Sequence, residues 1–96
     1  MIYTSSQIKA SLEPIFLKYG VRSAILFGSY AKGLQTDNSD VDILVDSGLR
    51  GLAFFGLLEE ITDTLGKAVD LLDVSQVKPD SRIDEAAKKE GIKLYG

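Results

Sequence analysis

Apolar residues recur with two different periods along the chain, and these periods predict alternating helices and strands. Spacings of three and four residues are typical of a helix that buries one face, whereas short continuous or alternating apolar runs are typical of strands. The pattern predicts, in chain order, a helix over 6–18, a strand over 24–27 followed by a small turn and helix, a strand over 41–45, a helix over 52–65, a strand over 68–73, a helix that begins after Asp80 or Ser81 and ends near Glu90, and a strand over 92–95.

This order of elements predicts an α/β (α+β) fold: a small mixed β-sheet with helices packed on one face. The 96 residues allow one hydrophobic core, so we expect a single domain over 1–96. The hydrophobic share of 45% and the charged share of 26% are those of an ordinary globular protein and do not indicate disorder.

Carboxylates gather on one face of the predicted sheet. Side chains alternate along a strand, so the valines and isoleucine of 41–45 share one face while Asp40 and Asp42 share the other. By the same alternation, Asp70 lies on the matching face of strand 68–73. If these two strands are neighbours, the three carboxylates converge.

Such a cluster predicts a metal site. Like charges this close repel and raise one of their pKa values, and a divalent cation removes the conflict. Mg²⁺ commonly takes its oxygen ligands from one or two carboxylates and from substrate phosphates. Asp40, Asp42 and Asp70 are therefore the predicted metal ligands and catalytic residues of a phosphoryl-transfer site, which commonly holds two ions. Each aspartate taken singly also fits a solvated strand end, so the prediction depends on the combination.

The segment 28–33 lies between the first predicted strand and these aspartates. Gly28 and Gly33 allow the backbone to approach a phosphate closely, and Ser29 lies where the strand passes into a short helix with free N–H groups. Lys32 fits either a phosphate ligand or a surface charge. Leu34 stands where a P-loop requires lysine, so the segment is not a P-loop.

Composition excludes several other chemistries. The chain has no histidine and no cysteine, which excludes imidazole catalysis, thiol nucleophiles and zinc sites built from these ligands. A net charge of −3 disfavours autonomous nucleic-acid binding. The first six residues lack the regions of a signal peptide, and no apolar run approaches the ~20 residues of a membrane span, so we expect a cytoplasmic protein without membrane association.

The motifs resemble those of the minimal nucleotidyltransferases in the DNA polymerase beta superfamily. Their signature is Gly-Ser, a spacer and Asp-x-Asp, which Gly28-Ser29 and Asp40-Val41-Asp42 match, with a third carboxylate at Asp70. The resemblance covers nearly the whole chain and implies the polymerase beta palm-like fold. It also implies transfer of a nucleoside monophosphate, from ATP or another nucleoside triphosphate, to a hydroxyl. Gly28 and Ser29 would then hold the β- and γ-phosphates, Asp40 and Asp42 would bind both Mg²⁺ ions, and Asp70 would complete one ion and help to deprotonate the hydroxyl.

The acceptor is the missing part of this interpretation, because 96 residues leave no room for an acceptor domain. It must be a separate molecule, or a second copy of the chain in a homo-oligomer must shape the pocket. The resemblance implies a HEPN-type protein partner, with this chain as an antitoxin that adenylylates a tyrosine of the toxin. Two alternatives stay open: a non-catalytic antitoxin module that binds a nucleotide or a partner, and a nucleotidyltransferase for small molecules, as in aminoglycoside modification.

Overall fold

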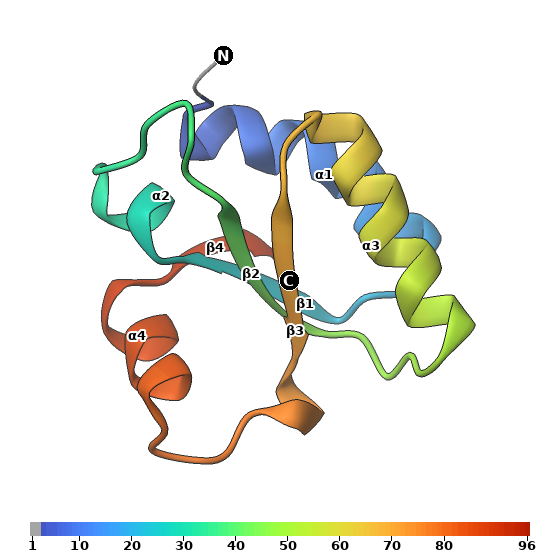
Figure 1. Ribbon diagram of the computed structural model, residues 1–96. Helices are drawn as coiled ribbons and strands as arrows, with labels where there is room; N and C mark the ends of the chain where they lie inside the picture. Colours follow the sequence, from blue (N-terminus) through green and yellow to red (C-terminus); the bar gives the residue numbers. More distant parts are fainter. Residues whose placement is uncertain (1–2) are drawn as a thin grey trace.

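The computed structural model describes residues 3–96, in which helices lie on both faces of a four-stranded sheet (Figure 1). Met1 and Ile2, which belong to the six-residue segment that lacks the regions of a signal peptide, lie outside the described residues. The helices are α1 (Ser5–Lys18), α2 (Ser29–Lys32), α3 (Leu52–Leu65) and α4 (Arg82–Glu90), with a 3-10 turn η1 (Val74–Gln76), and the strands are β1 (Ser23–Phe27), β2 (Val41–Asp46), β3 (Val69–Asp73) and β4 (Ile92–Tyr95). Every predicted element is present, with ends within two residues of the prediction.

Short-range side-chain contacts set where the helices begin and end. Thr4 and Gln7 form a capping box, in which each side chain accepts a hydrogen bond from the other residue's backbone N–H. The Ser81 hydroxyl accepts a hydrogen bond from the Asp84 N–H at 3.3 Å and so begins α4. At the end of α3, Gly66 adopts the left-handed conformation that stops a helix.

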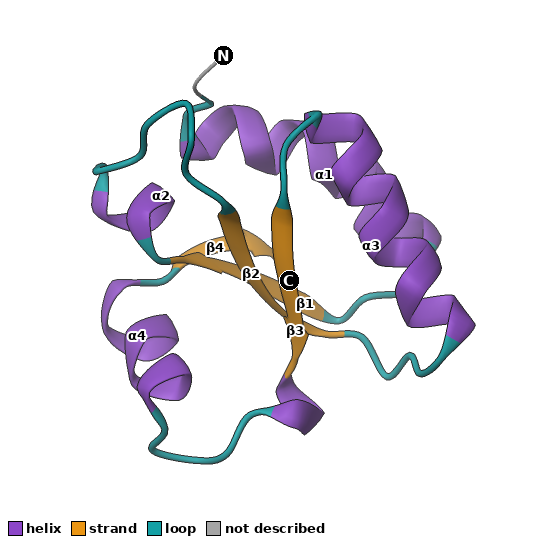
Figure 2. Cartoon of the chain, viewed as in Figure 1, coloured by secondary structure: helices purple, strands orange, loops and turns teal. Residues whose placement is uncertain are grey.

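The sheet has the strand order β3-β2-β1-β4 and is mixed. β1 runs antiparallel to both β2 and β4, whereas β2 and β3 are parallel and are joined through α3. A parallel pair needs such a crossover, because the chain must return to the same end of the sheet. The loop 33–40, teal in Figure 2, leads from α2 to the start of β2 and leaves Asp40 directly before that strand.

One face of the sheet is covered by α1 and α3. The buried side chains between them form the main core, which comprises Ile8, Leu12, Phe16, Val21, Ala24, Leu26, Tyr30, Val41, Ile43, Val45, Leu57, Ile61, Leu65, Leu71 and Leu94. The predicted alternation along β2 is confirmed, since its three β-branched residues all lie in this core. Tyr30 is 2% exposed and packs here, as expected for a core residue.

The prediction that the helices pack on one face is wrong for α4, which lies against the opposite face (Figure 1). A second, smaller apolar cluster forms there from Phe27, Leu44 and Ala87, with Ile25, Leu72, Val77, Ile83 and Ala86 packed against it. The physical reason is that the face carrying Asp42 also carries apolar strand residues, whose exposure to water would be unfavourable. None of the helices described in residues 3–96 is long and apolar enough to cross a membrane.

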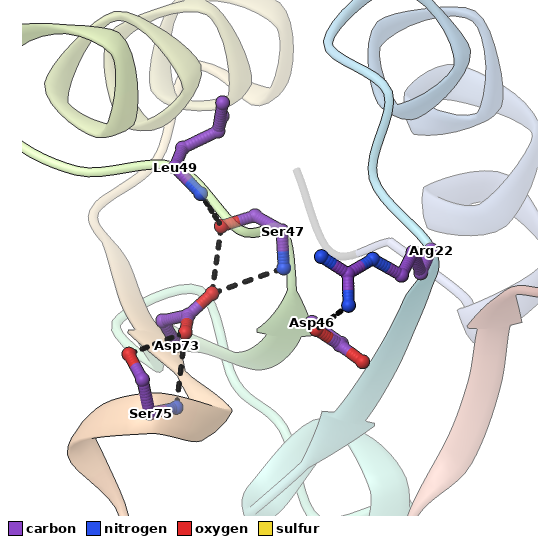
Figure 3. A network of polar contacts seen from close by, with 6 residues as sticks. All are labelled: Arg22, Asp46, Ser47, Leu49, Asp73 and Ser75. Atoms are coloured by element: carbon purple, nitrogen blue, oxygen red, sulfur yellow. Dashed lines mark hydrogen bonds and ion pairs between the residues drawn. The ribbon is translucent and has the colours of Figure 1, made fainter.

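A buried carboxylate, Asp73, holds β2 and β3 together at the end of the two strands that lies away from Asp42 and Asp70 (Figure 3). Asp73 is 4% exposed and accepts hydrogen bonds from the backbone N–H and hydroxyl of both Ser47 and Ser75. Burial raises the pKa of Asp73, but the four hydrogen bonds outweigh it and lower that pKa from 3.8 to about 2. The Ser47 hydroxyl in turn accepts from the Leu49 N–H at 3.1 Å. The end of β2 is thereby held against the end of β3.

We predict that Asp73→Asn lowers the free energy of unfolding at neutral pH by about 2 kcal/mol. The asparagine side chain carries an NH₂ group in place of one carboxylate oxygen, and this group cannot accept the hydrogen bonds that the oxygen accepted. The wild-type contribution is fully present above the unfolded pKa of 3.8 and is lost as the pH falls toward the folded pKa of about 2. Urea denaturation at a series of pH values measures both effects.

Asp46→Asn is the matched control, since the Asp46 carboxylate forms a partly exposed ion pair with Arg22 at 3.6 Å (Figure 3). We expect this variant to lose about 0–1 kcal/mol. If the loss in the free energy of unfolding caused by Asp73→Asn is as large at pH about 2 as at neutral pH, the charge of Asp73 does not stabilise the contact between the ends of β2 and β3.

Candidate active site

The register of the sheet brings Asp42 and Asp70 side by side. Asp42 pairs with Phe27 of antiparallel β1 on one side and with Asp70 of parallel β3 on the other. Directly paired residues share a face of the sheet and lie about 5 Å apart. The prediction that these two strands are neighbours, with their carboxylates on a common face, is confirmed by this register.

The charges of the three predicted aspartates act on one another. Asp42 is half-buried, whereas Asp40, two residues earlier, and Asp70 are exposed. Burial raises the pKa of Asp42, and the negative charges of Asp70 and Asp40 raise it further. At neutral pH the cluster therefore contains charges that oppose one another, and a bound cation would relieve the repulsion.

The donor set of this cluster suits a hard cation. Its atoms are carboxylate oxygens, and Mg²⁺ takes one or two such ligands together with substrate phosphates. Within residues 3–96, no three acidic side chains are already gathered closely enough to hold a metal ion. The register places Asp42 and Asp70 in adjacent positions, but the expected convergence of all three carboxylates is not seen among these residues.

Gly28 is required where β1 ends, because its backbone lies directly against the Asp42 carboxylate. A Cβ atom added to Gly28 would lie 2.2 Å from Asp42 Oδ2, far inside van der Waals contact. Its φ of 73° and ψ of −150° also lie in a region that is open essentially to glycine alone. The glycine of the Gly-Ser motif and the second aspartate of the Asp-x-Asp motif are therefore in direct contact.

Ser29 and Lys32 lie at opposite ends of the single-turn helix α2. Ser29 is half-buried and directly follows Gly28, whose backbone lies against the Asp42 carboxylate. Lys32 is half-exposed and forms an ion pair with Glu90 at 3.4 Å, which connects α2 to the end of α4. In the structure, this cation therefore has an acidic partner, which the sequence did not indicate.

Two hollows flank the carboxylates, and neither was predicted. The first, of about 380 Å³, is polar and is lined by Tyr3 and the segments 37–40 and 65–68, so it includes Asp40. The second, of about 510 Å³, lies between β1 and α4. Each hollow joins segments far apart in the chain, so local spacing could not reveal it. The one available signal was the apolar Leu44 and Leu72 on the aspartate face, which indicated that another element covers it.

A family comparison adds to this geometry. The model of the polymerase beta nucleotidyltransferase family matches residues 10–96. The chain belongs to this family. The resemblance of Gly28-Ser29 and Asp40-Val41-Asp42 to the family's signature is thus confirmed at the level of the whole chain, and so is the expected fold.

Relatives within the polymerase beta nucleotidyltransferase family carry protein adenylyltransferase names. A candidate protein adenylyltransferase of Methanocaldococcus jannaschii is 42% identical over 77 residues, which are 77% of this chain and 82% of the relative. The protein adenylyltransferase MntA of Thermococcus cleftensis is 44% identical over 63 residues, 64% of either chain.

Solved structures with the same fold include toxin–antitoxin complexes. One, a toxin–antitoxin with AMP-PNP, has a TM-score of 0.78 at 26% identity and covers 92% of this chain and 73% of that chain. Another holds the tri-AMPylated HEPN toxin of Shewanella oneidensis with its MNT antitoxin, with a TM-score of 0.73 over 97% of this chain and 73% of that chain. Its 21% identity shows a shared fold alone.

We predict that Asp42→Asn raises the free energy of unfolding in metal-free buffer at neutral pH, because it removes a half-buried charge that Asp70 and Asp40 repel. The gain should be about 1 kcal/mol or less, the size of a partly exposed charge interaction. Since the folded pKa of Asp42 is raised, the wild type should recover this stability as the pH falls through that pKa.

Urea denaturation with a chelator present measures the difference, and Asp46→Asn on the same strand and face is the control. Asp46 is paired with Arg22, so its neutralisation should bring no gain. A loss of stability in Asp42→Asn, equal to that of Asp46→Asn, would contradict the repulsion.

Proposed function

We propose that this chain transfers AMP from ATP to a hydroxyl of a HEPN-type protein partner and acts as an antitoxin. The observation that carries the proposal is the row formed by Gly28, Asp42 and Asp70, in which a glycine backbone meets one of two adjacent carboxylates. Family membership and relatives named protein adenylyltransferase support it. The toxin–antitoxin with AMP-PNP supports both ATP as the co-substrate and a protein partner.

The Gly-Ser segment holds the triphosphate in this proposal. The backbone of Gly28 can approach a phosphate closely because no Cβ intervenes, and the Ser29 hydroxyl and N–H are donors for the β- and γ-phosphates. Lys32 supplies a positive charge to the phosphates after it leaves Glu90, whose Oε2 lies 3.4 Å from the Lys32 Nζ. Lysine acts there as a point charge rather than as a bidentate ligand.

In this proposal the three aspartates hold two Mg²⁺ ions. Asp40 and Asp42 would bind both ions, and Asp70 would bind one of them. When bound, Mg²⁺ neutralises the charge on the carboxylates and on the phosphates. Burial raises the pKa of Asp42 most, and the charges of Asp70 and Asp40 raise it further; this repulsion is the part that a bound cation would offset. The half-buried position of Asp42 keeps its carboxylate fixed while the exposed pair stays accessible to substrate.

The transfer step needs a proton acceptor, and the chain has no histidine to serve. The acceptor oxygen forms a bond to the α-phosphorus, and the bond from that phosphorus to the α–β bridging oxygen breaks. Asp70, exposed at the edge strand next to Asp42, takes the proton of the hydroxyl, and pyrophosphate leaves with the electron pair of the broken bond.

The partner in this proposal is a protein in the cytoplasm, where ATP is available. The net charge of −3 favours a protein over a nucleic acid as the bound molecule. Whether a second copy of the chain shapes the pocket is a separate prediction, which the oligomeric state of the complex would test.

We predict that incubation with ATP labelled at the α-phosphate, Mg²⁺ and the HEPN-type partner moves the label onto the partner. The double variant Asp40→Ala/Asp42→Ala should transfer no label, and a chelator should abolish transfer by the wild type. Autoradiography and intact mass of the partner measure the result. A stable complex without any label would indicate a non-catalytic binding module, and label on an aminoglycoside instead would indicate a small-molecule transferase.

Two glycine variants sharpen this assay. Gly28→Ala should lose transfer at least tenfold, since its Cβ displaces the Asp42 carboxylate. Gly66→Ala has a similar positive φ of 64° but nothing within 4 Å of the added Cβ, so it introduces strain without touching the site. It should keep wild-type transfer at a temperature where it stays folded. Equal losses in both variants would assign the effect to strain alone.

A further inference from the structure

The ion pair between Lys32 and Glu90 joins the Gly-Ser segment to α4. Lys32 is the only basic residue in the segment 28–33, and its Nζ lies 3.4 Å from Glu90 Oε2. The two side chains are 48% and 44% exposed, so water weakens their attraction and either side chain can turn away at little cost. The cation that the proposed function assigns to the phosphates is therefore held, reversibly, by an acid from another element.

The backbone on both sides of this ion pair is held against β1. Helix α2 follows β1 directly, and the Gly28 carbonyl oxygen accepts a hydrogen bond from the Lys32 N–H at 3.2 Å. On the other side, Gly91 follows Glu90, and a Cβ atom added to Gly91 would lie 2.5 Å from Ile25 Cγ2 of β1. The end of α4 thus packs onto the strand from which α2 departs, so the two charges meet without depending on a long loop.

Lys32 also lies one helical turn after the Gly-Ser motif. It follows Ser29 by three residues and Gly28 by four, and residues at these spacings share one face of a helix. Side chains of a helix lean toward its N-terminus, so Lys32 is placed over the turn that Gly28 and Ser29 form. Its flexible four-carbon stem brings the ammonium group within reach of Glu90 or of phosphates beside this turn. The two anions repel each other and therefore compete for this cation.

We propose that Glu90 regulates nucleotide binding by competing with the β- and γ-phosphates for Lys32. The inference rests on the proposed function and adds a positioning residue that lies outside the Gly-Ser and Asp-x-Asp motifs. When the triphosphate binds, Lys32 turns from the Glu90 carboxylate to the phosphates, and when pyrophosphate leaves, Lys32 returns to Glu90. The competition lowers the affinity for every ligand that carries these phosphates, pyrophosphate included, and so favours release of this product.

Helix α4 carries two other acids, and neither is paired with Lys32. Asp84 forms an ion pair with Lys88 at 3.0 Å, whereas Glu85 is exposed and forms no ion pair with any other of residues 3–96. Glu85→Gln therefore removes the same charge from the same helix without changing a partner of Lys32. It is the matched control for Glu90→Gln.

Isothermal titration calorimetry of the full chain tests the competition without requiring turnover. The probes are AMP-PNP and pyrophosphate, each with Mg²⁺, and AMP, which lacks the β- and γ-phosphates. We expect Glu90→Gln to bind AMP-PNP and pyrophosphate about two- to fivefold more tightly than the wild type, the range of a partly exposed ion pair. AMP binding should not change, and Glu85→Gln should bind all three ligands as the wild type does. In the transfer assay, Glu90→Gln should lower the KM for ATP without raising kcat.

A Lys32→Gln background separates competition from direct repulsion between Glu90 and the phosphates. With the cation removed, Glu90→Gln should tighten AMP-PNP binding no further, because nothing remains to compete for. The same gain in the Lys32→Gln background, or the same gain from Glu85→Gln, would assign the effect to charge alone and overturn the inference. Weaker AMP-PNP binding by Glu90→Gln would show that Glu90 holds Lys32 in place for the phosphates, and this result would also overturn it.

The proposed function and the competition fail in different ways. If the chain binds nucleotide but transfers nothing, no label reaches the partner protein, while Glu90→Gln still tightens AMP-PNP binding. If only the competition is wrong, the label reaches the partner protein, and the wild type and Glu90→Gln bind AMP-PNP equally.

Discussion

The register between two parallel strands is the constraint on which the site depends. It pairs Asp42 with Asp70, so that two carboxylates leave the same face of the sheet from adjacent positions. No rotation of a loop can separate them, because their backbones are hydrogen-bonded within one ladder. Burial and repulsion both disfavour ionised Asp42, so the folded chain holds a charge arrangement that a cation or a ligand can relieve.

Much of the remaining structure serves to keep that register. The α3 crossover makes β2 and β3 parallel, and the hydrogen bonds of Asp73 to Ser47 and Ser75 fix the far ends of both strands. At the near end, Gly28 brings the backbone of β1 against Asp42, where a side chain would collide. Helices α1 and α3 pack on the face of the sheet opposite the aspartates. The candidate catalytic residues therefore lie on the other face, and α4 covers only part of it.

Local pattern was enough to predict much of this arrangement. Helical and strand periods located the four helices and four strands among residues 3–96, but not the 3-10 turn η1. Alternation predicted the common face that the register shows for Asp42 and Asp70, whereas Asp40 lies directly before β2. The spacing of Gly28-Ser29 and Asp40-Val41-Asp42 indicated the family. The position of α4 could not be predicted in the same way, because its sequence shows an amphipathic helix without saying which face of the sheet it covers. The hollow between β1 and α4 and the ion pair of Lys32 with Glu90 follow from that position, so they too required the structure.

The central claim is that the Asp42 and Asp70 pair is a repulsive arrangement that binding of Mg²⁺ and nucleotide relieves. The most direct measurement is the free energy of unfolding of the wild type and of Asp42→Asn as Mg²⁺ is added at saturating AMP-PNP. The account predicts that the wild type gains stability with Mg²⁺ and overtakes the variant, which gains little. Equal gains in the two proteins, or no gain in the wild type, would contradict it.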